Sequence, residues 1–170
     1  MASFPSSYIP TTTASATRAA DALTVPVSGL TYPNSLYAEF ERTVDTAAIS
    51  GIIEAYATGG NRFVLTLTAG GLAQQYNNSG NVDQVNNTIA GAITVGVVTK
   101  VAARTSTNDS RQAKDGTLGT QDISCANPTT PTALWFGRQA GGAELFGYLR
   151  RAAIWNRALT DAELQSVSST

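Results

Sequence analysis

Two glutamates near the first third of the sequence, Glu39 and Glu41, could do acid–base chemistry together. In an extended strand both carboxylates lie on one face, with Cα atoms about 6.6 Å apart at a rise of about 3.3 Å per residue. Paired carboxylates at such a separation can hydrolyse glycosidic bonds. A solvated strand face gives the same pattern, and we favour that interpretation. Asp45 and Glu54 have no carboxylate partner close in sequence.

Most other routes to catalysis are missing, because the 170 residues contain no histidine. This excludes Ser-His-Asp catalysis, the usual zinc sites and the commonest general base. The single cysteine, Cys125, has no imidazole to activate it and no partner for an intrachain disulfide. A free thiol fits assembly in a reducing cytoplasm. We therefore expect a protein that is not an enzyme and requires no cofactor.

A polar stretch between Gly70 and Gly91 contains the candidate ligand-binding residues. Tyr76 offers a ring that can stack on a sugar, and the amides beside it can pair with hydroxyl groups. The candidate glycan-binding residues are Gln74, Gln75, Tyr76, Asn77 and Asn78. We expect this stretch to form a strand followed by a long loop, since long structured loops often carry function.

Four further aromatic residues could also stack on sugars, but these four lie in predicted strands, where an aromatic side chain usually belongs to the core. These residues are Trp135, Phe146, Tyr148 and Trp155. We expect them in the core.

Composition limits the class of protein further. Charged residues make up 14% of the chain, against about 25% in typical proteins. The net charge is −1 and no basic cluster is present, so we expect no nucleic-acid partner. There is no apolar run of about 18 residues and no signal peptide at the start, so we expect no membrane insertion. The length fits one domain.

Short strands separated by turns follow one another along the chain. Leu36 to Arg42 alternates between apolar and polar residues, and strands are also predicted at 49–56, 62–68 and 93–104. Asp115-Gly116 is a strong hairpin signal. With one helix at the end, this pattern predicts an all-β fold, an antiparallel β-sandwich.

The last third of the chain is the most regular part. Residues 134–138 and 145–155 are rich in aromatic and branched residues, and Gly141-Gly142 between them predicts a hairpin. Thr160 and Glu163 have the spacing of a capping box, so a short helix should begin at Asp161.

This closing sequence resembles the end of laminin-G-like domains, which belong to the concanavalin A-like jelly-roll family. The residues that carry the likeness are Phe146, Gly147, Tyr148, Leu149, Ile154, Trp155, Arg157, Leu159, Thr160, Asp161, Glu163 and Leu164. The resemblance implies a jelly roll with one short C-terminal helix. Hydrolases of this fold carry a Glu-x-Asp-x-x-Glu strand motif, and the sequence from Glu39 to Val44 breaks it.

Calcium is a further implication of the resemblance, because laminin-G-like domains often bind this ion through Asp or Asn side chains and backbone carbonyls. Asp83, Asn108 and Asp109 lie in predicted loops and offer the hard oxygen ligands that calcium prefers. Their spacing is not that of an EF-hand, and turn formation is the default role of such residues.

The beginning of the chain resembles the lead-in to laminin-G-like modules of tailed-bacteriophage virion proteins, through Tyr8, Ile9 and Arg18. This likeness implies an extended arm over residues 1–24 and a jelly-roll domain over 25–170. The arm would bind a partner through Phe4, Tyr8, Ile9 and Arg18. A disordered tail is the alternative.

The sequence therefore predicts a structural surface protein of a phage virion, either a decoration or a fibre protein of the capsid or tail. It would bind other virion proteins through the arm, form a homo-oligomer, and lie on the virion surface after assembly in the host cytoplasm. The alternative is a carbohydrate-binding adhesion module that recognises host-surface glycans.

Overall fold

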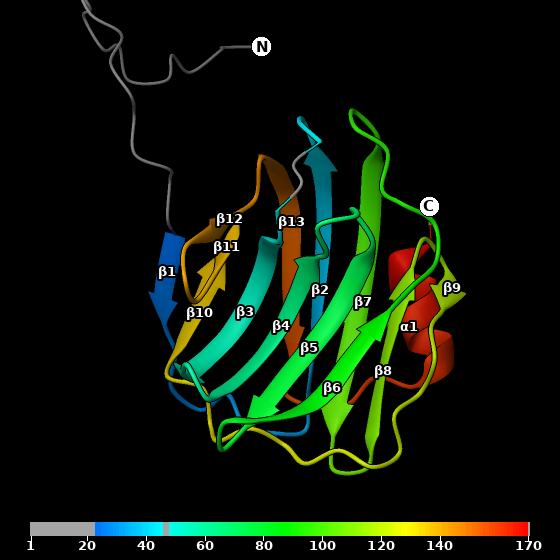
Figure 1. Cartoon of the computed structure of the whole chain (residues 1–170). Coiled ribbons are helices and arrows are strands. Elements are labelled where there is room, and N and C mark those ends of the chain that lie inside the picture. Colours follow the sequence, from blue (N-terminus) through cyan, green and yellow to red (C-terminus); the bar gives the residue numbers. More distant parts are fainter. Residues whose placement is uncertain (1–22, 46–47, 170) are drawn as a thin grey trace, which may run out of the picture.

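Two antiparallel sheets face each other in the computed structural model, which describes residues 23–45 and 48–169 (Figure 1). The six-stranded sheet has the order β1 (Leu23–Pro26), β10 (Ala133–Phe136), β3 (Ser50–Thr58), β4 (Asn61–Leu67), β5 (Ala73–Ser79) and β6 (Val82–Thr88). The five-stranded sheet has the order β13 (Gly147–Trp155), β2 (Asn34–Arg42), β7 (Val98–Ser106), β8 (Asp109–Lys114) and β9 (Thr117–Leu118). This architecture confirms the predicted β-sandwich.

The core lies between the sheets and follows from residue alternation within each strand. On β2, Leu36, Ala38 and Phe40 are fully buried, as their two-residue period predicts. Phe63 and Leu65 of β4 meet them from the other sheet in one cluster. Each sheet therefore has an inner face and an outer face, the latter turned away from its partner sheet.

A short helix, α1 (Asp161–Ser168), covers the outer face of the five-stranded sheet (Figure 1). The predicted capping box is present between Thr160 and Glu163. Leu164 is fully buried, and Trp155, expected in the core, is partly buried and packs against the same small cluster. Asp161 fixes the helix start to the sheet, because its carboxylate pairs with Arg104 at 2.5 Å and Arg111 at 2.6 Å.

The predicted hairpin between residues 134–138 and 145–155 is wrong, because its two strands belong to different sheets. β10 pairs with β1 and β3, whereas β13 pairs with β2. Between them, β11 (Arg138–Gln139) and β12 (Ala143–Glu144) form a two-stranded hairpin around Gly141-Gly142, both at positive φ. Local turn chemistry set this reversal, but not the partners of the longer strands.

Two aromatic residues at this crossover are consequently exposed. Phe146 is 50% exposed and Tyr148 on β13 is 63% exposed, so the prediction that they lie in the core is wrong. β13 is an edge strand, and alternation turns Tyr148 away from the interior.

The polar stretch after Gly70 contains no long loop, contrary to expectation. It forms β5 and β6, joined by a tight turn at Gly80 and Asn81, both at positive φ. The predicted strand at 93–104 begins later, at Val98. The Asp115-Gly116 hairpin between β8 and β9 is confirmed.

Strand β1 begins at Leu23, two residues before the expected start of the domain at residue 25. The predicted arm residues Phe4, Tyr8, Ile9 and Arg18 lie outside the described residues. The one helix in the described part of the chain is too short to cross a membrane.

Candidate functional site

The predicted glycan-binding residues all lie on β5, and strand alternation divides them between the two faces of the sheet. Gln75 and Asn77 point inward and are fully buried. Gln75 Nε2 donates to the Arg104 carbonyl at 2.9 Å, and Asn77 Nδ2 donates to Thr105 Oγ1 at 2.6 Å. These two amides therefore connect β5 to β7 across the interior and are closed to a ligand.

Gln74 and Tyr76 point outward from the same strand and line a cleft of about 270 Å³. The cleft lies over β4, β5 and β6 on the outer face of the six-stranded sheet, and we call it the β4–β6 cleft. Its lining residues are Ile49, Arg62, Thr66, Gln74, Tyr76, Asn86 and Gln139. Register explains the grouping, because Gln74 pairs with Thr66 on β4 and Tyr76 pairs with Asn86 on β6.

The hairpin β11–β12 forms one wall of the cleft, since Gln139 belongs to it. The backbone N–H of Ala140 donates to Glu54 Oε2 at 2.6 Å, which fixes the hairpin to β3. Gly51 allows the close approach, because a Cβ there would collide with the main chain of Arg138 and Gln139. The wall therefore rests directly on the sheet.

Tyr76 is held from both sides. The guanidinium carbon of Arg62 lies 5.1 Å from the centroid of the Tyr76 ring, in cation–π geometry. The Tyr76 hydroxyl donates to Asp83, and Asn78 Nδ2 donates to the same carboxylate at 3.0 Å. These hydrogen bonds lower the pKa of Asp83 and keep it ionised. Asn78 thus positions Tyr76 and Asp83, although it does not itself line the cleft.

Amide side chains supply the rest of the polar surface. Gln74 Nε2 donates to Asn86 Oδ1 at 2.5 Å, which leaves the carbonyl of Gln74 and the amino group of Asn86 for other partners. Thr66 donates to the Ser50 carbonyl at 2.9 Å, so its hydroxyl can still accept. The cleft therefore presents both donors and acceptors beside one aromatic ring.

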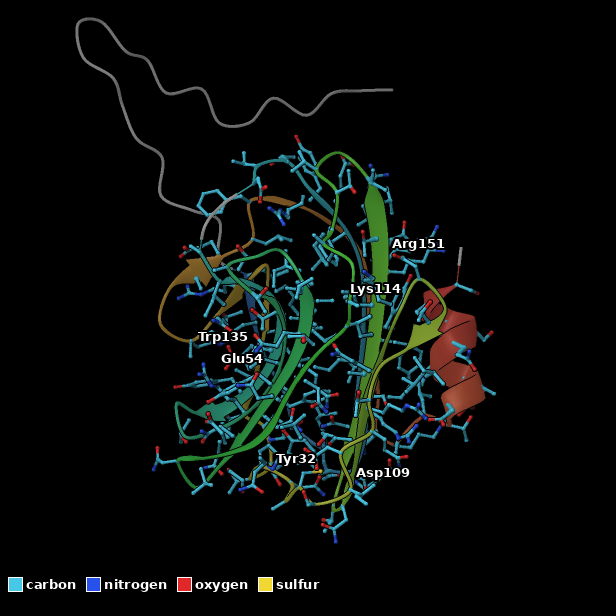
Figure 2. All side chains as sticks on the ribbon, turned by 45° about the vertical axis from the view of Figure 1, so that its right-hand side comes forward. Tyr32, Glu54, Asp109, Lys114, Trp135 and Arg151 are labelled. Carbon is cyan, nitrogen blue, oxygen red and sulfur yellow. The ribbon has the colours of Figure 1, made fainter. Side chains whose placement is uncertain are left out.

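Glu54 lies beneath the hairpin on β3, next to Trp135 of β10 (Figure 2). Its side chain is fully buried, and Oε1 is 3.8 Å from Arg62 Nη1. Burial raises the pKa of Glu54, against the hydrogen bond from Ala140 and the charges of Arg62 and Arg138. Trp135 stacks on Tyr56 with ring centroids 4.4 Å apart.

The carboxylate pair considered for acid–base chemistry lies on the other sheet. Glu39 Oε2 is 3.7 Å from Arg151 Nε, and Glu41 pairs with Arg150. Each glutamate thus faces an arginine of the neighbouring β13. The glutamates therefore lie on a strand face, as we favoured, but they are ion-paired and only partly exposed there.

Two of the three candidate calcium ligands lie on strands and not in the predicted loops, Asp83 on β6 and Asp109 on β8, and both carboxylates are engaged in other contacts. Asp83 accepts from Tyr76 and Asn78, and Asp109 accepts from Arg104 at 2.7 Å. Asn108 occupies the turn between β7 and β8 with φ of 55°. Across residues 23–45 and 48–169, no group of three or more Cys, Asp or Glu side chains is placed to hold a metal ion. Calcium binding stays a prediction.

Sequence reasoning missed five of the lining residues, which are Ile49, Arg62, Thr66, Asn86 and Gln139. Two of them carried a usable signal. Arg62 and Thr66 alternate with the inward-facing Phe63 and Leu65, so both had to point outward from β4. Gln139 had none, because its place depends on how the hairpin docks.

No protein-family model and no curated protein matches this sequence. Several solved structures are similar to this chain. One of them is the CBM40 of Ruminococcus gnavus IT-sialidase bound to α2,6 sialyllactose, with a TM-score of 0.66. That match has 19% identity and covers 82% of this chain and 84% of that chain.

Two further structures have the same architecture. Domain 4 of AbnA, a GH43 extracellular arabinanase from Geobacillus stearothermophilus in complex with arabinotriose, matches with TM-score 0.66 and 12% identity, over 82% of this chain and 68% of that one. The heptameric SAP-like pentraxin from Limulus polyphemus matches with TM-score 0.64 and 11% identity, over 86% and 72%. The chain thus has the jelly-roll β-sandwich fold of these domains.

Proposed function

We propose that this protein binds carbohydrate in the β4–β6 cleft. The observation that carries the proposal is the composition of that cleft, in which one tyrosine ring is surrounded by amide, hydroxyl and guanidinium groups. A sugar presents hydroxyl groups that both donate and accept, and amides answer both needs. The ring of Tyr76 offers an apolar surface to one face of the sugar. Concave sites with a few convergent polar groups are typical binding sites.

The structural neighbours support a sugar ligand but do not by themselves define one, since a fold hosts many functions. One neighbour was captured with sialyllactose and another with arabinotriose. The polar groups of the cleft in this chain make the argument specific. Of the two functions expected from the sequence, the carbohydrate-binding module is therefore the one we adopt.

We propose binding without hydrolysis. Hydrolysis of a glycosidic bond uses two carboxylates flanking it. The described residues that line the cleft include none, and the nearby Glu54 is buried beneath the hairpin.

The virion role has no counterpart among the neighbours reported above, which are sugar-bound domains and a pentraxin. A place on a virion surface, partners bound through residues 1–24, and a homo-oligomer stay predictions. The heptameric state of the pentraxin shows that this fold is compatible with oligomers. The same cleft on a particle surface would serve adhesion to a host glycan.

Replacement of Tyr76 by alanine tests the proposal. Because Tyr76 is the one aromatic side chain among the cleft-lining residues described, we expect the variant to lose at least about tenfold in affinity, or about 1.4 kcal/mol. A glycan array identifies the ligand of the wild-type protein, and isothermal titration calorimetry then gives both affinities.

The matched control is Tyr148→Ala, which removes an exposed tyrosine on the other sheet. This variant should bind like the wild type. Equal affinities for Tyr76→Ala and the wild type would place the sugar elsewhere, and a wild type that retains no glycan would refute the proposal.

A further inference from the structure

The charge of the β4–β6 cleft is one-sided. Arg62 is the single charged side chain among its described lining residues, and the others are amides, a hydroxyl, a tyrosine and an isoleucine. Asp83 accepts a hydrogen bond from the Tyr76 hydroxyl and does not line the cleft. A ligand in the cleft therefore meets one cation and no carboxylate among the described lining residues, although the charge of Asp83 acts on Arg62 from outside the cleft.

Six described arginines form an ion pair with an at least partly exposed carboxylate, and two of them, Arg104 and Arg111, share Asp161. The pairs are Arg42–Asp45, Arg104–Asp109, Arg111–Asp161, Arg150–Glu41, Arg151–Glu39 and Arg157–Glu163. Arg62 and Arg138 differ, because both lie near the buried carboxylate of Glu54, and Arg62 also interacts electrostatically with Asp83. Among the described residues, no exposed carboxylate forms an ion pair with either of these two guanidinium groups.

The hydrogen-bonding capacity of Arg62 is also largely unused. A guanidinium group carries five N–H donors. In Arg62, Nη1 donates to the Ala140 carbonyl at a long 3.4 Å, and its distance to Glu54 is 3.8 Å. Nε is buried without a partner, and the side chain as a whole is 19% exposed. Among the described residues, nothing accepts a hydrogen bond from Nη2.

We propose that the cleft selects sugars that carry a carboxylate, and that Arg62 pairs with this group. The inference rests on the proposed function and names its ligand class. A planar guanidinium matches a carboxylate better than it matches a hydroxyl, and such charge-assisted pairs are about twice as strong as neutral hydrogen bonds. Gln74, Asn86 and Gln139 remain for the hydroxyl groups, and Tyr76 for the ring.

Two kinds of sugar share this chemistry. Sialic acids carry the carboxylate on the anomeric carbon, and uronic acids carry it on the ring carbon at the other side of the ring oxygen. The common feature is one carboxylate on a six-membered sugar ring, and the experiment separates the two sources by using both as probes.

The test compares Arg62→Gln with Arg138→Gln. Both substitutions remove one positive charge from the surroundings of Glu54, but Arg138 stacks on Trp135 and does not line the cleft. Any general cost of leaving Glu54 with one cation is therefore common to both variants. Arg62→Lys keeps the charge and loses the planar donor group. Circular dichroism of each variant checks that it is folded.

The probes are sialyllactose, its methyl ester, lactose, an oligogalacturonate and arabinotriose, each titrated by calorimetry at low and at high salt. We expect one of the two acidic probes to bind at least about tenfold more tightly than the neutral ones, and its binding to weaken with salt. Arg62→Gln should abolish that preference, Arg62→Lys should keep part of it, and Arg138→Gln should stay within about threefold of the wild type.

Two results would overturn the inference, and only the second would also refute the proposed carbohydrate-binding function. If neutral probes bind as well as acidic ones and Arg62→Gln changes nothing, the carboxylate specificity is wrong and the carbohydrate-binding function stands. If none of the probes and no other glycan binds the folded wild type, the proposed function fails as well.

Discussion

Glu54 contacts both the hairpin that forms a wall of the cleft and the arginine that lines it. Its carboxylate fixes the hairpin by accepting from Ala140, and it also lies close to Arg62, the cation of the cleft. Burial opposes the charged form, and this effect outweighs the two neighbouring arginines, so the pKa is raised. Keeping Glu54 ionised in the folded protein therefore costs folding free energy.

This cost predicts a definite pH dependence. With a folded-state pKa above the unfolded value of about 4.3, the native state binds the proton more readily, so its stability rises as pH falls through the raised pKa. Glu54→Gln lacks this titration and keeps an oxygen for the Ala140 N–H. We expect the free energy of unfolding of the wild type to improve relative to Glu54→Gln between pH 7 and pH 5.

Urea denaturation of both proteins at the two pH values measures the difference between their free energies of unfolding. The contributions of all other carboxyl groups to the pH dependence cancel in this difference. A difference that stays constant, or that shifts in favour of the variant at pH 5, would contradict the prediction.

Individual residues of the site were only partly predictable from the sequence. Tyr76 and Gln74 were identified because a ring flanked by amides is recognisable in any conformation. Gln75 and Asn77 were assigned to the ligand although they are buried. Alternation normally separates the two faces of a strand by polarity, but on β5 amides occupy both faces, so the sequence carries no contrast.

At the scale of elements, the position of hairpin β11–β12 determines the shape of the cleft. Gly51→Ala tests this, because the added methyl group would collide with the backbone of Arg138 and Gln139, which cannot move without lifting the hairpin. We expect a loss of about 1–3 kcal/mol in the free energy of unfolding, as for other overpacked sites. Sugar affinity should fall too, since Gln139 would leave its place in the wall.

Gly59→Ala is the control, because a Cβ there meets nothing within 4 Å. Chemical denaturation and calorimetric titration of both variants give the two quantities. Equal stability of the two variants would show that the hairpin does not rest on Gly51.

Elements defined by local chemistry were predictable, and those defined by distant partners were not. The capping box of Thr160 and Glu163 placed the start of α1 correctly, since all its atoms lie within one turn. The crossover from β10 to β13 was mistaken for a hairpin, because nothing near Gly141 and Gly142 indicates that the two strands join different sheets.

For the molecule as a whole, stability depends on the apolar layer between the two sheets. Phe40 is among its largest fully buried side chains. Phe40→Ala should cost about 3–5 kcal/mol, a large part of the total stability of about 5–15 kcal/mol that is usual for a domain. Tyr148→Ala, at an exposed edge, should stay within about 0.5 kcal/mol of the wild type.

Thermal and urea unfolding followed by circular dichroism compare the three proteins. A large effect of Tyr148→Ala would show that β13 is covered in solution, for example by a second copy of the chain.

The overall architecture could be derived because short alternating strands must bury one face, and two stacked sheets achieve this. The distribution of strands between the two sheets could not be derived from the sequence, because it depends on contacts between segments far apart in sequence. The alternation of Leu36, Ala38 and Phe40 predicts that one face of the strand is buried. It does not indicate which strand of the other sheet packs on that face.

The position of α1 has a practical consequence. The helix covers the outer face of the five-stranded sheet (Figure 1). The cleft, by its lining residues, lies on the outer face of the opposite sheet. An affinity tag or a biotin attached after the helix would therefore tether the molecule by the face opposite the cleft. A sensor chip or bead coated in this way would present the binding surface to the solution, in a uniform orientation suited to weak, multivalent capture of glycans.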